Sequence, residues 1–102
     1  MNVTYLATLR AAPYKTLEDL AEELGVTKVT IHTRRKELEQ EQERYGDFAV
    51  IKDSGIVLIN YLAFLDFLKY RSRLKEKNLR KHVPPYNPTK VAKEIGWYAK
   101  EE

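Results

Sequence analysis

The sequence predicts a mainly α-helical fold with one small β-hairpin, and three observations support this prediction. Apolar residues recur at helical spacing over residues 16–43 and again from Tyr61 onward. Between these stretches lie two β-rich segments, Phe48–Ile51 and Ile56–Ile59, separated by a short polar loop. A glycine at position 25 leaves only a very short turn between the first two strongly periodic helices.

The N-terminal part of the chain predicts two helices in succession. Residues Val3–Arg10 have helical spacing and predict a short helix that Pro13 would end. Thr16 occupies a capping position, with Asp19 three residues later, and predicts the start of a second helix. The apolar stripe of this second helix consists of Leu17, Leu20, Ala21 and Leu24.

A helix-turn-helix follows from the spacing of three residues. Gly25 can end one helix and Thr27 can cap the next, which we expect to run from Lys28 to about Glu43. Ala21 is small enough for a close helix crossing, Gly25 allows a sharp turn, and Ile31 anchors the second helix on the core. This arrangement is typical of proteins that place one helix in the DNA major groove.

The rest of the chain predicts a wing, a long helix and an extension. In the hairpin loop Lys52–Gly55, glycine suits the position of positive φ, so we interpret the hairpin as the wing of a winged helix-turn-helix. The helix beginning at Tyr61 is expected to end near Lys77 or Leu79. Three prolines then predict an extended segment, followed by a short helix that Pro88 or Thr89 opens. We therefore predict a DNA-binding domain over residues 1–79 and a basic, proline-containing extension over 80–102.

Length and composition narrow the class of protein. A chain of 102 residues with 43% hydrophobic and 32% charged residues suits one small globular domain. The absence of cysteine excludes disulfides, thiolate catalysis and cysteine-bound metals. No apolar run approaches the ~20 residues that a membrane span needs, and the N-terminus does not resemble a signal peptide. We expect a cytoplasmic protein with no membrane contact.

Charge is distributed unevenly along the chain. Residues 1–68 contain 8 Lys and Arg against 11 Asp and Glu, whereas residues 69–102 contain 10 against 4. The basic last third is either an ordinary solvated surface or a contact surface for nucleic acid.

The predicted second helix of the helix-turn-helix carries the candidate DNA contacts. With Ile31 and Leu38 turned inward, the helical repeat places Val29, Thr33, Lys36 and Gln40 outward, flanked by Thr30 and His32. Threonine and histidine can hydrogen-bond base edges, valine can meet a thymine methyl, and the cations can neutralise phosphates. The candidate residues, including two at the wing tip, are Thr27, Lys28, Val29, Thr30, His32, Thr33, Arg34, Arg35, Lys36, Lys52 and Ser54.

Two charged regions have alternative interpretations. The helix becomes acidic at Glu37, Glu39, Glu41 and Glu43, so only its first half should lie against DNA. We interpret the acidic end as solvated; the alternative is contact with a neighbouring basic segment. The basic helix and tail can follow phosphates or bind an acidic partner, and their aromatic residues, Tyr70, Tyr86, Trp97 and Tyr98, are more typical of a tail that packs onto its own domain.

Nothing in the sequence indicates an enzyme. The two histidines, His32 and His82, lack the spacing of metal ligands, and there is no glycine-rich phosphate loop. We expect no catalytic residue, metal or cofactor.

The segments TLEDLAEELGVTKVTIHTRRKELE and FAVIKDSGIVLINYLAFLDFLKYR together resemble the winged excisionase-like proteins of phages and integrative elements, relatives of the mercury-resistance-regulator DNA-binding domain. The resemblance covers about residues 14–75 and does not include the segment after Leu79. By position, it implies that Thr27–Lys36 form the recognition helix and Lys52–Gly55 the wing tip. It also implies binding near a recombination junction with other copies or an integrase, or a role as a small phage regulator, and no catalytic residue.

The expected function is therefore sequence-specific binding of double-stranded DNA, as a recombination directionality factor or a transcriptional regulator. One small domain has limited contact area, which favours dimers or cooperative arrays on DNA. The tail can contact an integrase or another protein. The alternative is a protein-interaction adaptor that uses the same fold and basic tail to bind a replication or host protein.

Overall fold

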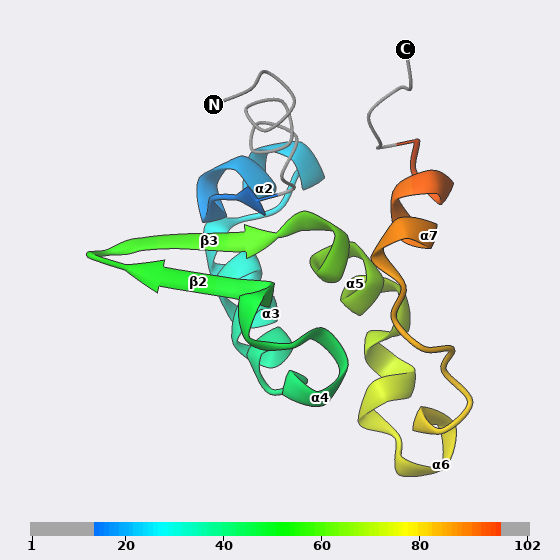
Figure 1. The fold of residues 1–102 in the computed structure, drawn as a ribbon. Coiled ribbons are helices and arrows are strands. Elements are labelled where there is room, and N and C mark those ends of the chain that lie inside the picture. Colours follow the sequence, from blue (N-terminus) through cyan, green and yellow to red (C-terminus); the bar gives the residue numbers. More distant parts are fainter. Residues whose placement is uncertain (1–13, 97–102) are drawn as a thin grey trace.

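The computed structural model describes residues 14–96, which form a mainly helical protein with a small antiparallel sheet (Figure 1). In chain order the elements are β1 (Tyr14–Lys15), α2 (Leu17–Leu24), α3 (Lys28–Glu39), α4 (Gln42–Tyr45), the 3-10 helix η1 (Asp47–Ala49), β2 (Val50–Asp53), β3 (Ile56–Asn60), α5 (Tyr61–Lys75), α6 (Lys77–Arg80) and α7 (Pro88–Glu94). The predicted helix Val3–Arg10 lies outside the described residues, as do Trp97 and Tyr98. None of the described helices is long and apolar enough to cross a membrane.

Local sequence signals position the first two described helices. The Thr16 side chain accepts a hydrogen bond from the Asp19 backbone N–H, and the Asp19 carboxylate accepts one from the Thr16 backbone N–H, which completes the expected capping box of α2. Gly25 follows α2 with φ of 70°, a left-handed conformation that glycine adopts without steric penalty. Thr27 then caps α3 by accepting from the Thr30 backbone. The predicted helix-turn-helix segments are therefore confirmed as helices joined by a short glycine turn.

The sheet consists of three antiparallel strands in the order β1-β3-β2. Val50 pairs with Ile59 and Asp53 with Ile56, so β2 and β3 form a hairpin, while β1 adds to the other edge of β3. Ser54 and Gly55 make the turn, with φ of 51° and 82°. Positive φ at both central residues is the geometry that matches the twist of a two-residue hairpin.

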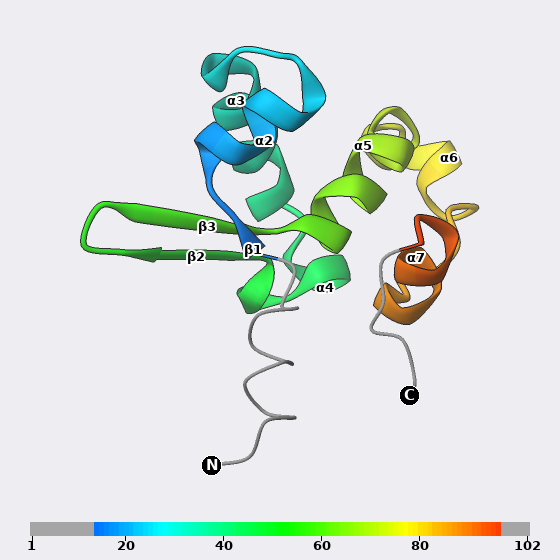
Figure 2. The same cartoon turned by 90° about the horizontal axis from the view of Figure 1, so that it is seen from above.

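The core lies where α2, α3 and α5 meet the sheet. Figure 2 shows α2 and α3 on one side of the hairpin and α5 continuing from the end of β3. The largest fully buried side chains come from all of these elements: Phe64, Phe67, Leu20, Ile31, Leu38 and Ile59. This packing fixes which face of α3 points away from the protein.

Several predicted boundaries were wrong. The long helix expected to end near Lys77 or Leu79 ends at Lys75, and the expected loop Lys52–Gly55 is reduced to Ser54 and Gly55, because Lys52 and Asp53 pair within the hairpin. The first strand of the hairpin begins at Val50, because residues Asp47–Ala49 form a 3-10 turn and Phe48 is exposed. The helix expected to reach Glu43 ends at Glu39, and the chain continues into the separate α4. The break turns the chain so that the Tyr45 hydroxyl donates a 2.6 Å hydrogen bond to Asp66 in α5. A tertiary contact thus overrides the local helical tendency.

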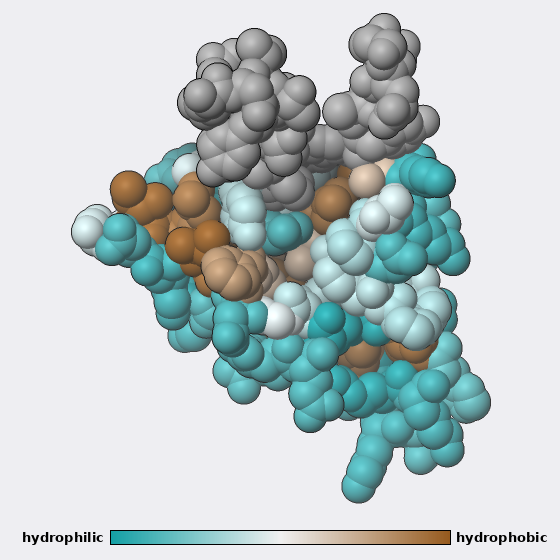
Figure 3. Space-filling model, in the orientation of Figure 1, coloured by the Kyte–Doolittle hydropathy of each residue, from teal (hydrophilic) through white to brown (hydrophobic). Residues whose placement is uncertain are grey.

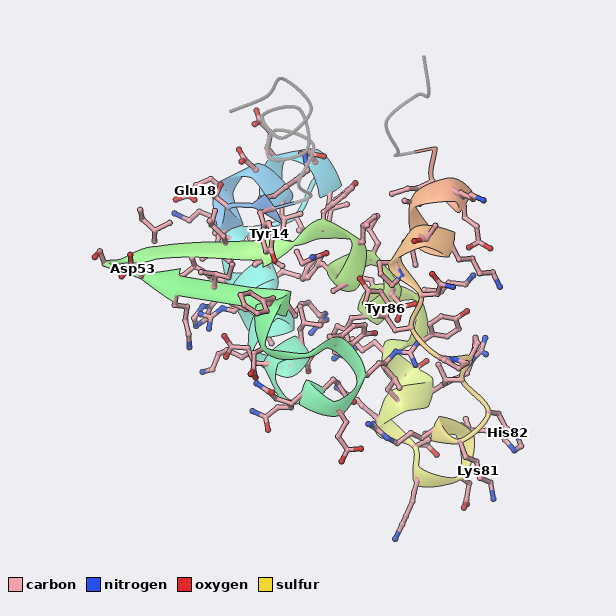
Figure 4. All side chains as sticks on the ribbon, in the orientation of Figure 1. Tyr14, Glu18, Asp53, Lys81, His82 and Tyr86 are labelled. Atoms are coloured by element: carbon pink, nitrogen blue, oxygen red, sulfur yellow. The ribbon has the colours of Figure 1, made fainter. Side chains whose placement is uncertain are left out.

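The C-terminal elements pack onto the same core. Asn87 caps α7 through the Lys90 backbone, with Pro88 at the first helical position, and Gly96 follows at φ of 76°. The Tyr86 ring contacts the Tyr45 ring edge-on, with centroids 4.9 Å apart. In Figure 4 the Tyr86 side chain points from the extended segment toward the centre of the protein. Tyr86 therefore packs onto the domain, as expected.

Candidate nucleic-acid interface

The outward face of α3, which we define as Val29, His32, Thr33 and Lys36, is exposed as predicted. Val29 is 74% exposed, although it is a large apolar side chain on a helix that buries Ile31 and Leu38. His32, Thr33, Lys36 and the neighbouring Gln40 are exposed as well. A helix that buries one stripe and displays short polar side chains, a cation and an apolar group on the other can enter a groove and contact base edges.

The start of α3 offers contacts suited to phosphate. Lys28 is exposed and forms an ion pair with Glu18 at 3.0 Å, which lowers the pKa of the Glu18 carboxyl. Such an exposed pair is weak and can exchange for a phosphate contact. The positive end of the helix dipole lies at the same place, beside the exposed cap Thr27. Thr30 is half-buried, with its hydroxyl 3.1 Å from that of Thr27.

Thr33 has a defined hydrogen-bonding role. Its hydroxyl donates to the carbonyl oxygen of Val29 at 3.0 Å, so the outward lone pairs of Oγ1 can only accept. A protein acceptor that enters the major groove can pair with the amino group of adenine or of cytosine.

Arg35 was expected at a phosphate, and this expectation is wrong. The residue is only 8% exposed because it lies between Ile31 and Leu38 on the inward stripe of the helix. Its guanidinium donates to Glu39 at 3.1 Å and contacts His32 Nδ1 at 2.8 Å. The helical spacing of residues 31, 35 and 38 places Arg35 on the buried stripe, but the charge of arginine suggested a surface position.

Arg34 lies at the edge of the outward face. Its side chain is half-buried, and Nη1 lies 3.3 Å from the Glu37 carboxylate. We expect it to contribute less to phosphate binding than Lys36, which has no ion pair among the described residues.

The acidic end of α3, which we define as Glu37 and Glu39 together with Glu41 just after the helix, is not an isolated solvated helix end. Glu37 accepts hydrogen bonds from Arg71 at 2.7 Å and from Lys75 at 3.1 Å, both in α5. The hydrogen bond from Arg71 is the main reason why the pKa of Glu37 falls to about 2. For Glu37 the alternative of contact with a neighbouring basic segment is therefore correct, whereas Glu43 is exposed and has no ion pair among the described residues.

The other two carboxylates of the acidic end are paired as well. Glu41 accepts from Arg80 of α6 at 3.0 Å, and Glu39 lies 3.4 Å from Lys52 of the hairpin. These ion pairs join α3 to α5 and β2, and join the residue before α4 to α6. They also reduce the repulsion that the carboxylates would exert on a nearby phosphate backbone.

The hairpin tip extends away from the body of the protein. Ser54 is exposed at the turn, and Lys52 remains 57% exposed despite its ion pair with Glu39. Figure 4 shows Asp53 at this tip, while Lys81 and His82 lie at the opposite end of the molecule. Figure 3 shows apolar surface along the hairpin, where Ile56 is exposed. The two regions expected to contact DNA, α3 and the hairpin, are thus linked through Glu39.

A buried polar cluster supports α4 and α5 behind the interface. Asp66 is 6% exposed, and its Oδ2 accepts from Arg44 and from the Tyr45 hydroxyl. Burial raises the pKa of Tyr45 and also raises the pKa of Tyr86 to about 12. The sequence does not indicate this cluster, because Asp66 lies 21 residues after Tyr45 and 22 after Arg44.

Comparison of the chain with protein-family models, with curated proteins and with solved structures finds no match.

Proposed function

We propose that this protein is a winged helix-turn-helix factor that binds double-stranded DNA, with α3 in the major groove and the β2–β3 hairpin as its wing. The observation that carries the proposal is the outward face of α3. Val29, His32, Thr33 and Lys36 project from it, while the carboxylates on the same helix are occupied by cations of the protein. A hairpin beside the recognition helix suits contact with the flanking backbone.

The strand order supports the same assignment. The short β1 precedes the helix-turn-helix and pairs with β3, which holds the hairpin against α2 and α3. Within this proposal, the role is that of a small recombination directionality factor or transcriptional regulator of a phage or mobile element. Dimers or arrays on DNA would extend the contact area beyond one domain.

Selection of duplexes from a random library, followed by fluorescence anisotropy at two salt concentrations, tests the proposal. We expect one sequence to be enriched and its affinity to fall steeply as salt rises. Replacing Thr33 and Lys36 together by alanine should remove the preference for this sequence without unfolding the domain.

A matched control has the same change of residue types on another surface. Thr89 and Lys93 are both exposed on α7, so the double variant T89A/K93A should keep the preference. If the α3 double variant bound the selected site as well as the unmodified protein, the proposed face would be wrong. Absence of binding to any duplex at low salt would instead support a protein-interaction adaptor.

A further inference from the structure

Arg35 is buried in an unusual way for an arginine. It is 8% exposed, and its Nε has no hydrogen-bond partner among the described residues. A buried polar group without a partner is destabilising and rare in proteins. The burial of Arg35 therefore reduces the stability of the fold. The two contacts that its guanidinium does make, to Glu39 and to His32, indicate the role of this side chain.

The contact between Arg35 and His32 determines where the imidazole carries its proton. A guanidinium has only N–H donors and no acceptor. At 2.8 Å from Nη2, the Nδ1 atom of His32 must therefore supply a lone pair. A neutral imidazole that accepts at Nδ1 carries its hydrogen on Nε2.

The contact on the other side of Arg35 restricts its movement. Nη1 donates to Glu39 at 3.1 Å, and Glu39 is itself 3.4 Å from Lys52 in the hairpin. The guanidinium is thus held between a carboxylate and the imidazole, both on its own helix. Arg35 acts as a positioning residue that orients His32 from the buried side.

We infer that Arg35 holds exposed His32 in the Nε2–H tautomer, so that the ring presents one hydrogen-bond donor to a guanine in the major groove. This inference rests on the proposed DNA-binding function. Guanine displays two acceptors there, N7 and O6, whereas thymine displays one acceptor, O4, beside its methyl group, cytosine displays a donor, and adenine displays a donor beside its acceptor. A donor-only ring edge matches guanine best, and Thr33 as an acceptor complements it with a preference for adenine or cytosine.

The tautomer can be measured in the protein without DNA. Long-range ¹H–¹⁵N NMR correlations distinguish Nε2–H from Nδ1–H imidazoles, and only His32 and His82 contribute signals. The variant H82Q assigns them. We expect His32 at pH 7.5 to be the Nε2–H tautomer, and R35M to give a mixture of tautomers. An Nδ1–H ring or a doubly protonated ring in the unmodified protein would overturn the inference.

If R35M does not fold, R35K supplies the second variant, since a lysine ammonium can still donate to Nδ1. We expect R35K to keep His32 in the Nε2–H tautomer. A mixture of tautomers in folded R35K with the ammonium near the ring would count against the positioning role.

Base recognition is tested on the duplex selected for the proposed function. Replacing each guanine in turn by 7-deazaguanine removes the N7 acceptor, and at one position this should weaken binding about 10-fold, the size of a good base contact. H32A should be insensitive to that replacement, whereas T89A, which changes an exposed residue of α7, should keep the sensitivity.

The outcomes separate the two claims. If no duplex is selected, the proposed function fails, and the NMR measurement still decides the tautomer. If a duplex is selected but no guanine in it depends on His32, the DNA-binding function stands and the guanine assignment is overturned.

Discussion

The outward face and the acidic end of α3 belong to one helix but have different surroundings. Val29 and Lys36 project from the protein, and Lys36 has no ion pair among the described residues. Glu37, less than one turn further on, contacts both Arg71 and Lys75. The difference shows that cations of α5 neutralise the carboxylate of Glu37, whereas the side chains of the outward face remain exposed to solvent.

The largest expected contrast is in stability, between a buried and an exposed apolar residue of α3. Leu38 is 1% exposed and Val29 is 74% exposed. L38A should lower the free energy of unfolding by about 2 to 5 kcal/mol through the cavity it creates. V29A should change it by less than about 0.5 kcal/mol. Urea denaturation measures both, and a comparable loss in V29A would mean that the outward face is packed against something.

The next effect concerns the acidic end. E37Q removes the charge that Arg71 and Lys75 contact, and we expect a loss of about 1 to 2 kcal/mol, allowing for a side chain that is about a quarter exposed. The control E22Q changes an exposed carboxylate without an ion pair among the described residues and should be nearly neutral.

The same variant makes a prediction about pH. The pKa of Glu37 falls to about 2 in the folded protein from its ordinary value of 4.5. The charged form therefore stabilises the fold above about pH 4.5, and this contribution is lost as the pH falls toward 2. The stability difference between the unmodified protein and E37Q should shrink over this range. A constant difference would show that the ion pairs are not its cause.

A smaller effect is expected at the turn that orients the outward face. Gly25 has φ of 70°, and an added Cβ would meet no atom within 4 Å. G25A should therefore cost only the left-handed conformation, about 1 kcal/mol. G25N should cost less, because asparagine tolerates this conformation. Thermal denaturation tests whether G25A loses more stability than G25N. Equal losses of stability in the two variants would indicate a steric cause.

The sequence was sufficient where structure depends on neighbouring residues. The caps Thr16 and Thr27 and the turn at Gly25 follow from local hydrogen bonding, and the hairpin follows from Ser54 and Gly55. These signals predicted the helices, the hairpin and the outward face of α3.

The sequence was insufficient where the partners are distant. Glu37 and Arg71 are 34 residues apart, so their ion pair depends on how α5 packs against α3. The end of α3 at Glu39 depends in the same way on the contact between Tyr45 and Asp66. Arg35 was predictable from its spacing alone, but only if a charged residue is allowed on a buried stripe.

The central claim is that the outward face of α3 binds DNA, and a comparison of two lysines tests it most directly although the expected effect is the smallest. One lysine belongs to the outward face, and the other forms an ion pair with the acidic end. Lys36 has no ion pair among the described residues, whereas Lys75 contacts Glu37. The measurement is the salt dependence of binding to the selected duplex, as the slope of log K against log salt concentration. K36A should reduce the magnitude of this slope by about 0.9, the value of one phosphate contact, and K75A should leave it unchanged. An unchanged slope in K36A, or a reduction in K75A alone, would contradict the assignment of DNA binding to the outward face of α3.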